Sequence, residues 1–528
     1  MGMYLNPGNS GFETIRNGRY VDKSGLISLI NRTIGTTQKL TCISRPRRFG
    51  KSFAAKMLCA YYDKTCDSQS LFCDLAIAVD EERNESYRKH LNQYDVIYLD
   101  MTNIMGKTAP DDMVSYIEQR VTEELLRAYP KQEAGRTLDE TLLSTVEMTK
   151  NKFIMIIDEW DAPIRETPEI EKSYLHFLRM LFKGSGTTDR IFAAVYMTGI
   201  LPVRKDGSQS AISDFKEFTM VNPWLFSEYV GFTEQEVKEL CLEQQGDFQA
   251  MKQWYDGYTL GGMTSVYNPN SVMEALQYHN YRSYWIETSA SRSLMEYISL
   301  DFDGMSRTTA QLLGGVPVPV DPYGFSNDLV TFRDRDDVLT LLIHLGYLAY
   351  DQENQTARIP NEEIRLEFAR AVRGVKRHET IRRVRESDRL IYDTIHQDAE
   401  AVAAQIEKIH AEETAILFYN NEQSLRSVVK LAYFSYRDHY LKFEELPAGD
   451  GYADLVYLPR KMSSVPALVI ELKWNQNAEG AIAQIREKQY PEALRGYEGE
   501  VLLVGIGYDK NAREGKRKHS CRIEKVEL

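Results

Sequence analysis

The sequence predicts an α/β fold in three parts: an N-terminal domain with a parallel sheet, a helical middle domain and a smaller α/β domain at the C-terminus. The chain has 528 residues, more than a single hydrophobic core organises, and about three domains fit that length. Short apolar runs alternate with helical patterns in the first part of the chain, and a strand–helix–strand pattern returns near its end.

The N-terminal runs are near-continuous in apolar character, which favours strands buried on both faces of a parallel sheet. Their alternation with helical segments is typical of a parallel α/β domain, which we expect at residues 1–225. The runs are 39–44 (KLTCIS), 96–100 (VIYLD), 153–158 (FIMIID) and 191–198 (IFAAVYMT).

The middle domain, expected at residues 226–390, is interpreted as a helical lid. Thr233 and Glu236 have the spacing of a capping box that opens one helix. Ser271 is the expected N-cap of another helix. The apolar run at 337–350 continues as helix or strand.

The last domain, expected at residues 391–528, has an α-β-β-α-β order. Its expected elements are a helix at 422–436, strands at 452–458 and 467–474, a helix at 480–494 and a strand at 500–507.

Composition excludes several classes of protein. The net charge of −13 argues against a protein that coats nucleic acid without specificity. No apolar run approaches the roughly 18 residues that cross a bilayer, and the N-terminus has no signal-peptide pattern. The six cysteines form no C-x-x-C pair, which favours reduced thiols. We therefore expect a cytoplasmic protein without a membrane partner.

A phosphate-binding loop is predicted at Arg45-Pro46-Arg47-Arg48-Phe49-Gly50-Lys51-Ser52, between a strand and a helix. Backbone N–H groups at a helix N-terminus attract anions. Lys51 is expected to reach the β- and γ-phosphates of ATP, and the Ser52 hydroxyl to ligate Mg²⁺. Arg45 stands where the G-x-x-x-x-G-K-[ST] pattern has its first glycine, and on this motif alone a chance surface loop remains an alternative.

A second motif strengthens the prediction. The apolar run 154–157 ends in Asp158-Glu159, so both acids lie at the end of a buried strand. Asp158 is expected to hold Mg²⁺ through water, and Glu159 to orient and deprotonate the attacking water. The alternative is a strand-end turn with solvated acids. Thr198, at the end of the next strand, is a candidate γ-phosphate sensor, and Arg190 and Arg204 are candidate charge-stabilising arginines.

These residues resemble the bacterial AAA-ATPase-like family, which pairs a P-loop ATPase with a C-terminal PD-(D/E)XK nuclease domain. The resemblance extends over most of the chain, and it implies that Arg45 does not inactivate the loop, because the family's usual P-loop also lacks that glycine. The motifs are RPRRFGKS (45–52), YVDKSGLI (20–27), MTGILPV (197–203), WYDGY (254–258), VYNPNS (266–271), YWIETS (284–289), LGYLAY (345–350) and IPNEEI (359–364).

A nuclease site is predicted from Asp454 on one strand and Glu471-Leu472-Lys473 on the next. Glu471 and Lys473 point to one face, because side chains alternate along a strand. Asp454 and Glu471 are expected to hold Mg²⁺ or Mn²⁺, and Lys473 to orient water and offset negative charge. The segment also resembles the nuclease domain of the family. A salt bridge between Glu471 and Lys473 is the structural alternative.

Four further features belong to this hypothesis. Glu422 on the preceding helix is a candidate metal-site residue, and Gln484 and Lys488 lie one turn apart on the following helix. The basic segment 370–389 is either a solvated helix or linker, or a contact to a phosphate backbone.

Three functions fit these patterns. The first is an ATPase, with ATP and Mg²⁺ as cofactors, whose nucleotide state controls cleavage of nucleic acid by its own C-terminal domain. The second is a nucleotide-dependent switch whose nuclease fold only binds DNA, and the third is an ATPase that remodels another protein. Nucleic acid, DNA before RNA, is the expected partner, and a homo-oligomer is a further option.

Overall fold

The computed structural model describes most of the chain, and the described residues fall into two compact units. One lies within Met1–Leu294 and Pro319–Phe368, the other within Met295–Val318 and Ala369–Leu528. The described residues are 2–183, 186–203, 205–206, 209–210, 212, 214–285, 305–325, 332–374, 378–413, 422–433, 440–448, 451–459, 465–487, 499–512 and 517–527.

The first unit contains a five-stranded sheet in which all neighbouring strands are parallel, as the sequence predicts. The strand order is β2-β3-β4-β1-β7. The short strand β7 is not predicted, because its three residues include exposed Lys216 and no apolar run. The strands are β1 (Leu40–Ser44), β2 (Asp95–Asp100), β3 (Phe153–Asp158), β4 (Phe192–Gly199) and β7 (Lys216–Phe218).

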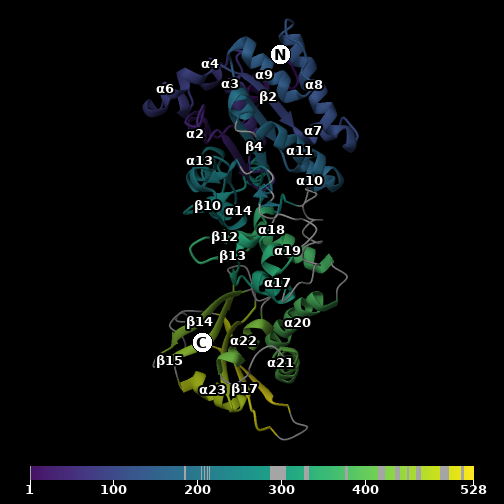
Figure 1. Cartoon of the computed structure of the whole chain (residues 1–528). Helices are drawn as coiled ribbons and strands as arrows, with labels where there is room; N and C mark the ends of the chain where they lie inside the picture. Colours follow the sequence, from purple (N-terminus) through teal and green to yellow (C-terminus); the bar gives the residue numbers. More distant parts are fainter. Residues whose placement is uncertain are drawn as a thin grey trace. The chain divides into compact units, whose positions relative to one another are not determined.

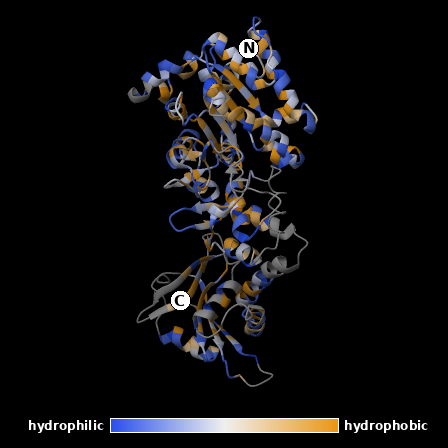
Figure 2. Ribbon diagram, viewed as in Figure 1, coloured by the Kyte–Doolittle hydropathy of each residue, from blue (hydrophilic) through white to orange (hydrophobic). Residues whose placement is uncertain are grey.

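Helices cover both faces of this sheet, as Figure 1 shows. One face carries α3 (Lys51–Tyr62), which packs on β3 and β4. The other face carries α8 (Met113–Ala128), α9 (Leu138–Thr149) and α11 (Glu171–Phe182), whose apolar sides share one core with the strands. The strands are hydrophobic along most of their length (Figure 2), which suits burial between two helical layers.

Shorter helices complete this part of the first unit. They are α1 (Ser10–Arg16), α2 (Gly25–Asn31), α4 (Gln69–Phe72), α5 (Ala76–Val79), α6 (Glu81–His90), α7 (Met101–Met105), α10 (Ala162–Glu166) and α12 (Thr187–Ile191).

The middle of the chain is largely helical, as predicted, and also contains short antiparallel strands. Its helices are α13 (Glu234–Gln244), α14 (Phe248–Tyr255), α15 (Pro269–Tyr278), α17 (Met305–Leu313), α18 (Arg335–Leu345), α19 (Glu362–Gly374) and α20 (His378–Ile395), and its strands are β8 (Phe232–Thr233), β9 (Tyr258–Leu260), β10 (Met263–Tyr267), β11 (Val318–Pro319), β12 (Ala349–Asp351) and β13 (Thr356–Arg358).

One helix start is confirmed and another is corrected. Thr233 and Glu236 form the predicted capping box of α13. The predicted N-cap Ser271 is wrong, because α15 begins three residues earlier than expected and Asn268 caps it. Pro269 explains the shift: proline lacks an N–H and suits the first helical position. The Ser271 hydroxyl instead contacts the carboxylate of Glu363, at 3.0 and 2.9 Å.

The second unit is built around a mixed sheet with the order β14-β15-β16-β17-β18. Strands β16 and β17 are parallel and the other pairs are antiparallel. The edge strands β14 and β18 are not predicted, because charged residues interrupt their apolar pattern, a common property of edge strands. The elements are α21 (Ala399–Glu413), α22 (Glu422–Ala432), β14 (Tyr440–Ala448), β15 (Gly451–Pro459), β16 (Ala467–Trp474), α23 (Ala478–Glu487), β17 (Glu500–Tyr508) and β18 (His519–Glu527).

The two faces of this sheet have separate cores. One core joins the strands to α20, α21 and α22, and the other joins them to α23. Helices α22 and α23 are described only to residues 432 and 487, so the rest of the predicted helices 422–436 and 480–494 lies outside the described residues or beyond the helix end. Among the residues that the structure describes, no helix combines the length and apolar character needed to cross a membrane.

Candidate nucleotide and nuclease sites

The loop that follows β1 has the geometry of an anion-binding turn. Gly50 adopts a φ of +91° directly before α3, and Arg48 a φ of +66°. The side chain of Lys51 is buried, and its Nζ donates hydrogen bonds to the carbonyl oxygens of Arg45 (3.0 Å) and Pro46 (2.8 Å). Lys51 therefore spans the loop and holds its cationic end beside the N-terminus of α3, where a phosphate is favoured.

Arg45 is an anchor for this loop. Its guanidinium is fully buried and donates to the backbone carbonyls of Ser44 (2.9 Å), Phe218 (3.0 Å) and Phe226 (3.4 Å). Burial lowers the pKa of Arg45 to about 10. Arg45 thus ties the start of the loop to β7 and to the short 3-10 helix Trp224–Phe226, a role that a glycine could not have.

The acids predicted at the end of β3 lie next to this loop. The Thr198 hydroxyl on β4 donates to Asp158 Oδ1 and accepts from the Glu159 amide N–H (3.2 Å). Thr102 Oγ1 donates to Glu159 Oε2 at 2.6 Å. Glu159 adopts a φ of +54°, an unusual conformation for a non-glycine residue, which turns the chain sharply after the strand.

Burial changes the titration of two groups here. It raises the pKa of Asp158, against the opposing effect of hydrogen bonds from Thr198 and Ser52. Burial also lowers the pKa of Lys51 to about 8, although the negative charges of Glu159 and Asp158 oppose that shift. Lys51, Ser52, Asp158 and Thr198 are therefore neighbours in space.

A cavity of about 830 Å³ opens beside Lys51, Ser52 and Glu159. The loop residues Arg48 to Ser52 and Glu159 line one side of it. Tyr20, Val21, Phe232 and Met273 line other parts. The volume lies within the range of pockets that bind small molecules. Asp158 and Thr198 are not among its lining residues.

Phe49 and Arg47 both belong to the predicted phosphate-binding loop, but they lie differently with respect to the cavity. The ring of Phe49 lines the cavity and packs edge-on against Tyr258 of β9, with centroids 5.2 Å apart. Arg47 does not line the cavity; its Nη2 lies 3.9 Å from Glu166 Oε1 on α10.

The predicted nuclease residues meet at neighbouring strands of the second sheet. Leu455 on β15 pairs with Ile470 on β16, so Asp454 and Glu471 occupy the next opposing positions, and opposing residues of antiparallel strands share a face. Asp454 Oδ2 accepts from the Leu472 amide N–H at 2.8 Å. Both carboxylates are buried, with exposed fractions of 6% and 2%. Lys473 Nζ lies 3.8 Å from Glu471 Oε1.

Comparison with protein families matches both parts of the chain. Residues 7–208 match the AAA-ATPase-like family model, described as a predicted AAA-ATPase. Residues 420–518 match a model of the PD-(D/E)XK nuclease superfamily. The chain carries an AAA-ATPase-like domain and a PD-(D/E)XK superfamily domain. The resemblance seen in the sequence motifs is confirmed for both.

Two individual proteins show weaker similarity. A protein described as "Uncharacterized protein in vnfD 5′region" from Azotobacter chroococcum mcd 1 is 26% identical over 301 residues, which is 54% of either chain. The chain thus spans about half the length of this curated relative. The Aeropyrum pernix ORC2 protein, solved in ADPNP-ADP complexes, is 11% identical and covers 66% of this chain and 93% of its own, with a TM-score of 0.28. A score that low does not establish a shared fold.

The residues of the nuclease-superfamily domain fit a divalent cation only in part. Asp454 and Glu471 supply the hard oxygen atoms that Mg²⁺ and Mn²⁺ prefer. Within the described ranges, however, no three acidic, histidine or cysteine side chains gather into a metal-binding group. Glu422 is exposed at the start of α22, Gln484 is half-buried on α23, and Lys488 lies outside the described residues.

Arg426 was not predicted from the sequence, and it occupies a carboxylate oxygen of the candidate metal ligand Asp454. It lies on α22 one turn after Glu422, and its Nη2 donates to Asp454 Oδ1. Its sequence signal is only its spacing, since residues four apart share a helix face.

The AAA-ATPase-like domain also contains an unpredicted arginine. Arg165 on α10 donates through Nε to Asp161 Oδ2 at 2.8 Å, and its Nη2 lies 3.9 Å from Glu159 Oε2. Its side chain is 9% exposed. The four-residue spacing from Asp161 is the only sequence signal that could have suggested it.

Arg190 cannot be the charge-stabilising arginine for the phosphate-binding loop of its own chain. It lies on α12, which precedes β4, and its guanidinium pairs with Glu147. Because β1 and β4 are parallel, the start of β4 and the loop after β1 lie at opposite edges of the sheet. The other candidate, Arg204, lies outside the described residues.

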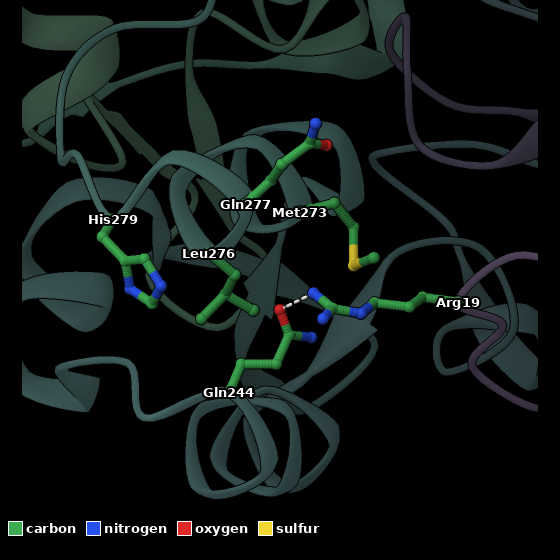
Figure 3. A pocket seen from close by; sticks show the side chains of 6 residues that line it. All are labelled: Arg19, Gln244, Met273, Leu276, Gln277 and His279. Carbon is green, nitrogen blue, oxygen red and sulfur yellow. Dashed lines mark hydrogen bonds between the residues drawn. The ribbon is translucent and has the colours of Figure 1, made fainter.

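A smaller cavity, of about 400 Å³, shares the lining residues Arg19 and Met273 with the cavity of about 830 Å³ described above. Figure 3 shows Arg19 reaching across it to Gln244, whose side-chain oxygen accepts a hydrogen bond from the guanidinium. Leu276, Gln277 and His279 complete its lining. No sequence motif pointed to it.

Proposed function

We propose that this chain binds and hydrolyses ATP, and that its nucleotide state controls metal-dependent cleavage of nucleic acid, DNA before RNA, by its C-terminal domain. The observation that carries the proposal is the convergence of Lys51, Ser52, Asp158 and Glu159 at one edge of the sheet, beside a cavity of about 830 Å³. The proximity of motifs that are distant in the sequence supports a role in phosphoryl transfer.

Each residue has an assigned role in the proposed hydrolysis. Lys51 leaves its carbonyl partners and binds the terminal phosphates, while the N-terminus of α3 holds the same oxygens through backbone N–H groups. Glu159, oriented by Thr102, accepts a proton from the attacking water. Ser52 and Asp158 would hold Mg²⁺, whose charge neutralises the phosphates.

In the nuclease domain, Asp454 and Glu471 would hold the second cation and Lys473 would position water and stabilise negative charge at the scissile phosphate. Residues 1–225, 226–390 and 391–528 are our proposed ATPase, lid and nuclease domains. We propose a cytoplasmic location, and the option of a homo-oligomer remains part of the proposal.

Two variants of the full chain test the two activities separately. Lys51→Ala should lose ATP binding, measured by calorimetric titration with ATP and Mg²⁺. Lys473→Ala should keep ATP hydrolysis and lose nicking of circular DNA with Mg²⁺ or Mn²⁺. Unchanged ATP binding in Lys51→Ala would refute the ATPase, and unchanged nicking in Lys473→Ala would refute the assigned nuclease site.

The second candidate function is a nucleotide-dependent switch whose nuclease fold binds DNA without cutting it. The contact of Arg426 with Asp454 favours it, because a carboxylate already paired with a guanidinium is less available to a cation. Under this alternative, wild-type protein binds DNA but does not nick DNA or RNA with any combination of metal and ATP.

A further inference from the structure

The contact between Arg426 and Asp454 occupies the oxygen that a cation would need. Asp454 is held on both sides, by the Arg426 guanidinium at Oδ1 and by the Leu472 amide N–H at Oδ2. The backbone amide can remain when a cation binds, because a carboxylate oxygen has more than one lone pair. The guanidinium carries a full positive charge, and it competes directly with a metal ion.

Charge balance makes this competition strong. Asp454 and Glu471 bring two negative charges, and Arg426 and Lys473 bring two positive charges within ion-pair distance of them. A site that is already neutral attracts a divalent cation less than one with spare negative charge. Both acids are buried, so solvent screens these interactions little.

The side chain of Arg426 reaches solvent, so the guanidinium can exchange partners. Its side chain is 22% exposed, whereas that of Arg45 in the other unit is fully buried. Released from Asp454, a planar guanidinium can bind a phosphate diester through two parallel hydrogen bonds. Asp454 and Glu471 are where the proposed function puts the scissile phosphate, so the released group would lie near the substrate backbone.

We propose that Arg426 is an exchangeable counter-ion: it neutralises Asp454 while the site is free of metal, and it moves to a nucleic-acid phosphate when a divalent cation takes its place. Metal binding and nucleic-acid binding then strengthen each other. A cation at Asp454 releases Arg426 to bind a phosphate, and a phosphate that binds Arg426 leaves Asp454 open to a cation. This inference rests on the proposed function, since it requires Asp454 to hold a cation.

The test is the affinity of the full-length protein for Mn²⁺ without nucleotide, measured from the free-ion signal in electron paramagnetic resonance. Asp454→Asn gives the background from other sites. Arg426→Gln keeps hydrogen-bond donors and removes the charge, and it should bind Mn²⁺ about tenfold more tightly than wild type. Arg426→Ala should shift in the same direction. Arg486→Ala is the matched control, because this exposed arginine of the same domain pairs with Glu524 and should leave the affinity unchanged.

A second readout uses DNA. In a Lys473→Ala background with Mn²⁺ present, adding Arg426→Gln should lower the affinity for a short duplex and reduce the salt dependence of binding by about one phosphate contact, because the guanidinium no longer binds a phosphate. Equal or weaker Mn²⁺ binding by both Arg426 variants, or a duplex affinity and salt dependence that Arg426→Gln leaves unchanged, overturns the inference alone. Wild-type Mn²⁺ binding no greater than that of Asp454→Asn overturns the proposed metal site as well.

Discussion

The nucleotide site and the nuclease site hold their charged groups by different means. In the first, the hydrogen-bond partners are neutral: Thr198 binds Asp158, Thr102 binds Glu159, and backbone carbonyls bind Lys51, while the Arg165 guanidinium lies farther off, 3.9 Å from Glu159. In the second, the partners are charged: Arg426 binds Asp454, and Lys473 lies beside Glu471. A neutral partner orients a charge without cancelling it, so under our proposals the nucleotide site keeps its charges for a ligand while the nuclease site exchanges them.

The largest expected effect tests whether Glu159 is a working base or only a turn residue. Glu159→Gln keeps the size of the side chain and removes its ability to take a proton, so ATP turnover should fall at least about 100-fold while ATP still binds. The measurement is steady-state phosphate release together with bound nucleotide after gel filtration. Glu166→Gln, an exposed acid on the adjacent helix α10, is the control; normal turnover by Glu159→Gln removes that residue from its role.

The next effect tests the buried guanidinium of Arg45, which binds only backbone carbonyls among the hydrogen bonds described above. Arg45→Ala leaves three buried carbonyls without their donor, and we expect a loss of about 3 kcal/mol in the stability of this domain. Urea denaturation followed by circular dichroism measures it. Arg47→Ala, at a half-exposed neighbour, should cost about 0.5 kcal/mol or less. Equal losses in the two variants would contradict the anchoring role of Arg45.

A smaller effect tests the neutral hydroxyl between the two acids. Thr198→Val preserves shape and removes both the donor to Asp158 and the acceptor for the Glu159 amide, so turnover should fall about tenfold. Thr198→Ser should retain most activity. If valine and serine behave alike, the hydroxyl does not position the acids.

The effect that is smallest near neutral pH is a pH dependence. Burial lowers the pKa of Lys51 to about 8, so the nucleotide-free protein carries this charge below pH 8 and loses it above. ATP binding should then weaken by only about twofold from pH 7 to 8 and by up to about tenfold for each further pH unit. Titration calorimetry from pH 7 to 9.5 measures it, and constant affinity over that range would show that Lys51 stays charged.

The sequence predicts the elements whose residues carry their own signal. The run FIMIID coincides with β3, and the loop, Asp158 and the Glu471-Leu472-Lys473 strand all lie where the patterns place them. β7 and the edge strands β14 and β18 escape prediction because pairing with a neighbour, rather than an apolar pattern, makes them strands.

Contacts between side chains and partners far away in the sequence are harder to predict than the elements themselves. Nothing in the local sequence tells that the Arg45 guanidinium reaches Phe218 and Phe226, or that Arg426 meets Asp454. Both contacts depend on how elements far apart in the chain pack together. The error at Ser271 has a local cause instead, since Pro269 fixes the helix start and leaves Asn268 as the cap.

The coupling of the two sites is tested most directly by the rate at which wild-type protein nicks circular DNA with Mn²⁺ in the presence of ATP, of ADP and of no nucleotide. We predict that the rate with ATP differs at least severalfold from both other rates. The same nicking rate in all three conditions, with ATP hydrolysis running normally, would contradict control of cleavage by nucleotide state.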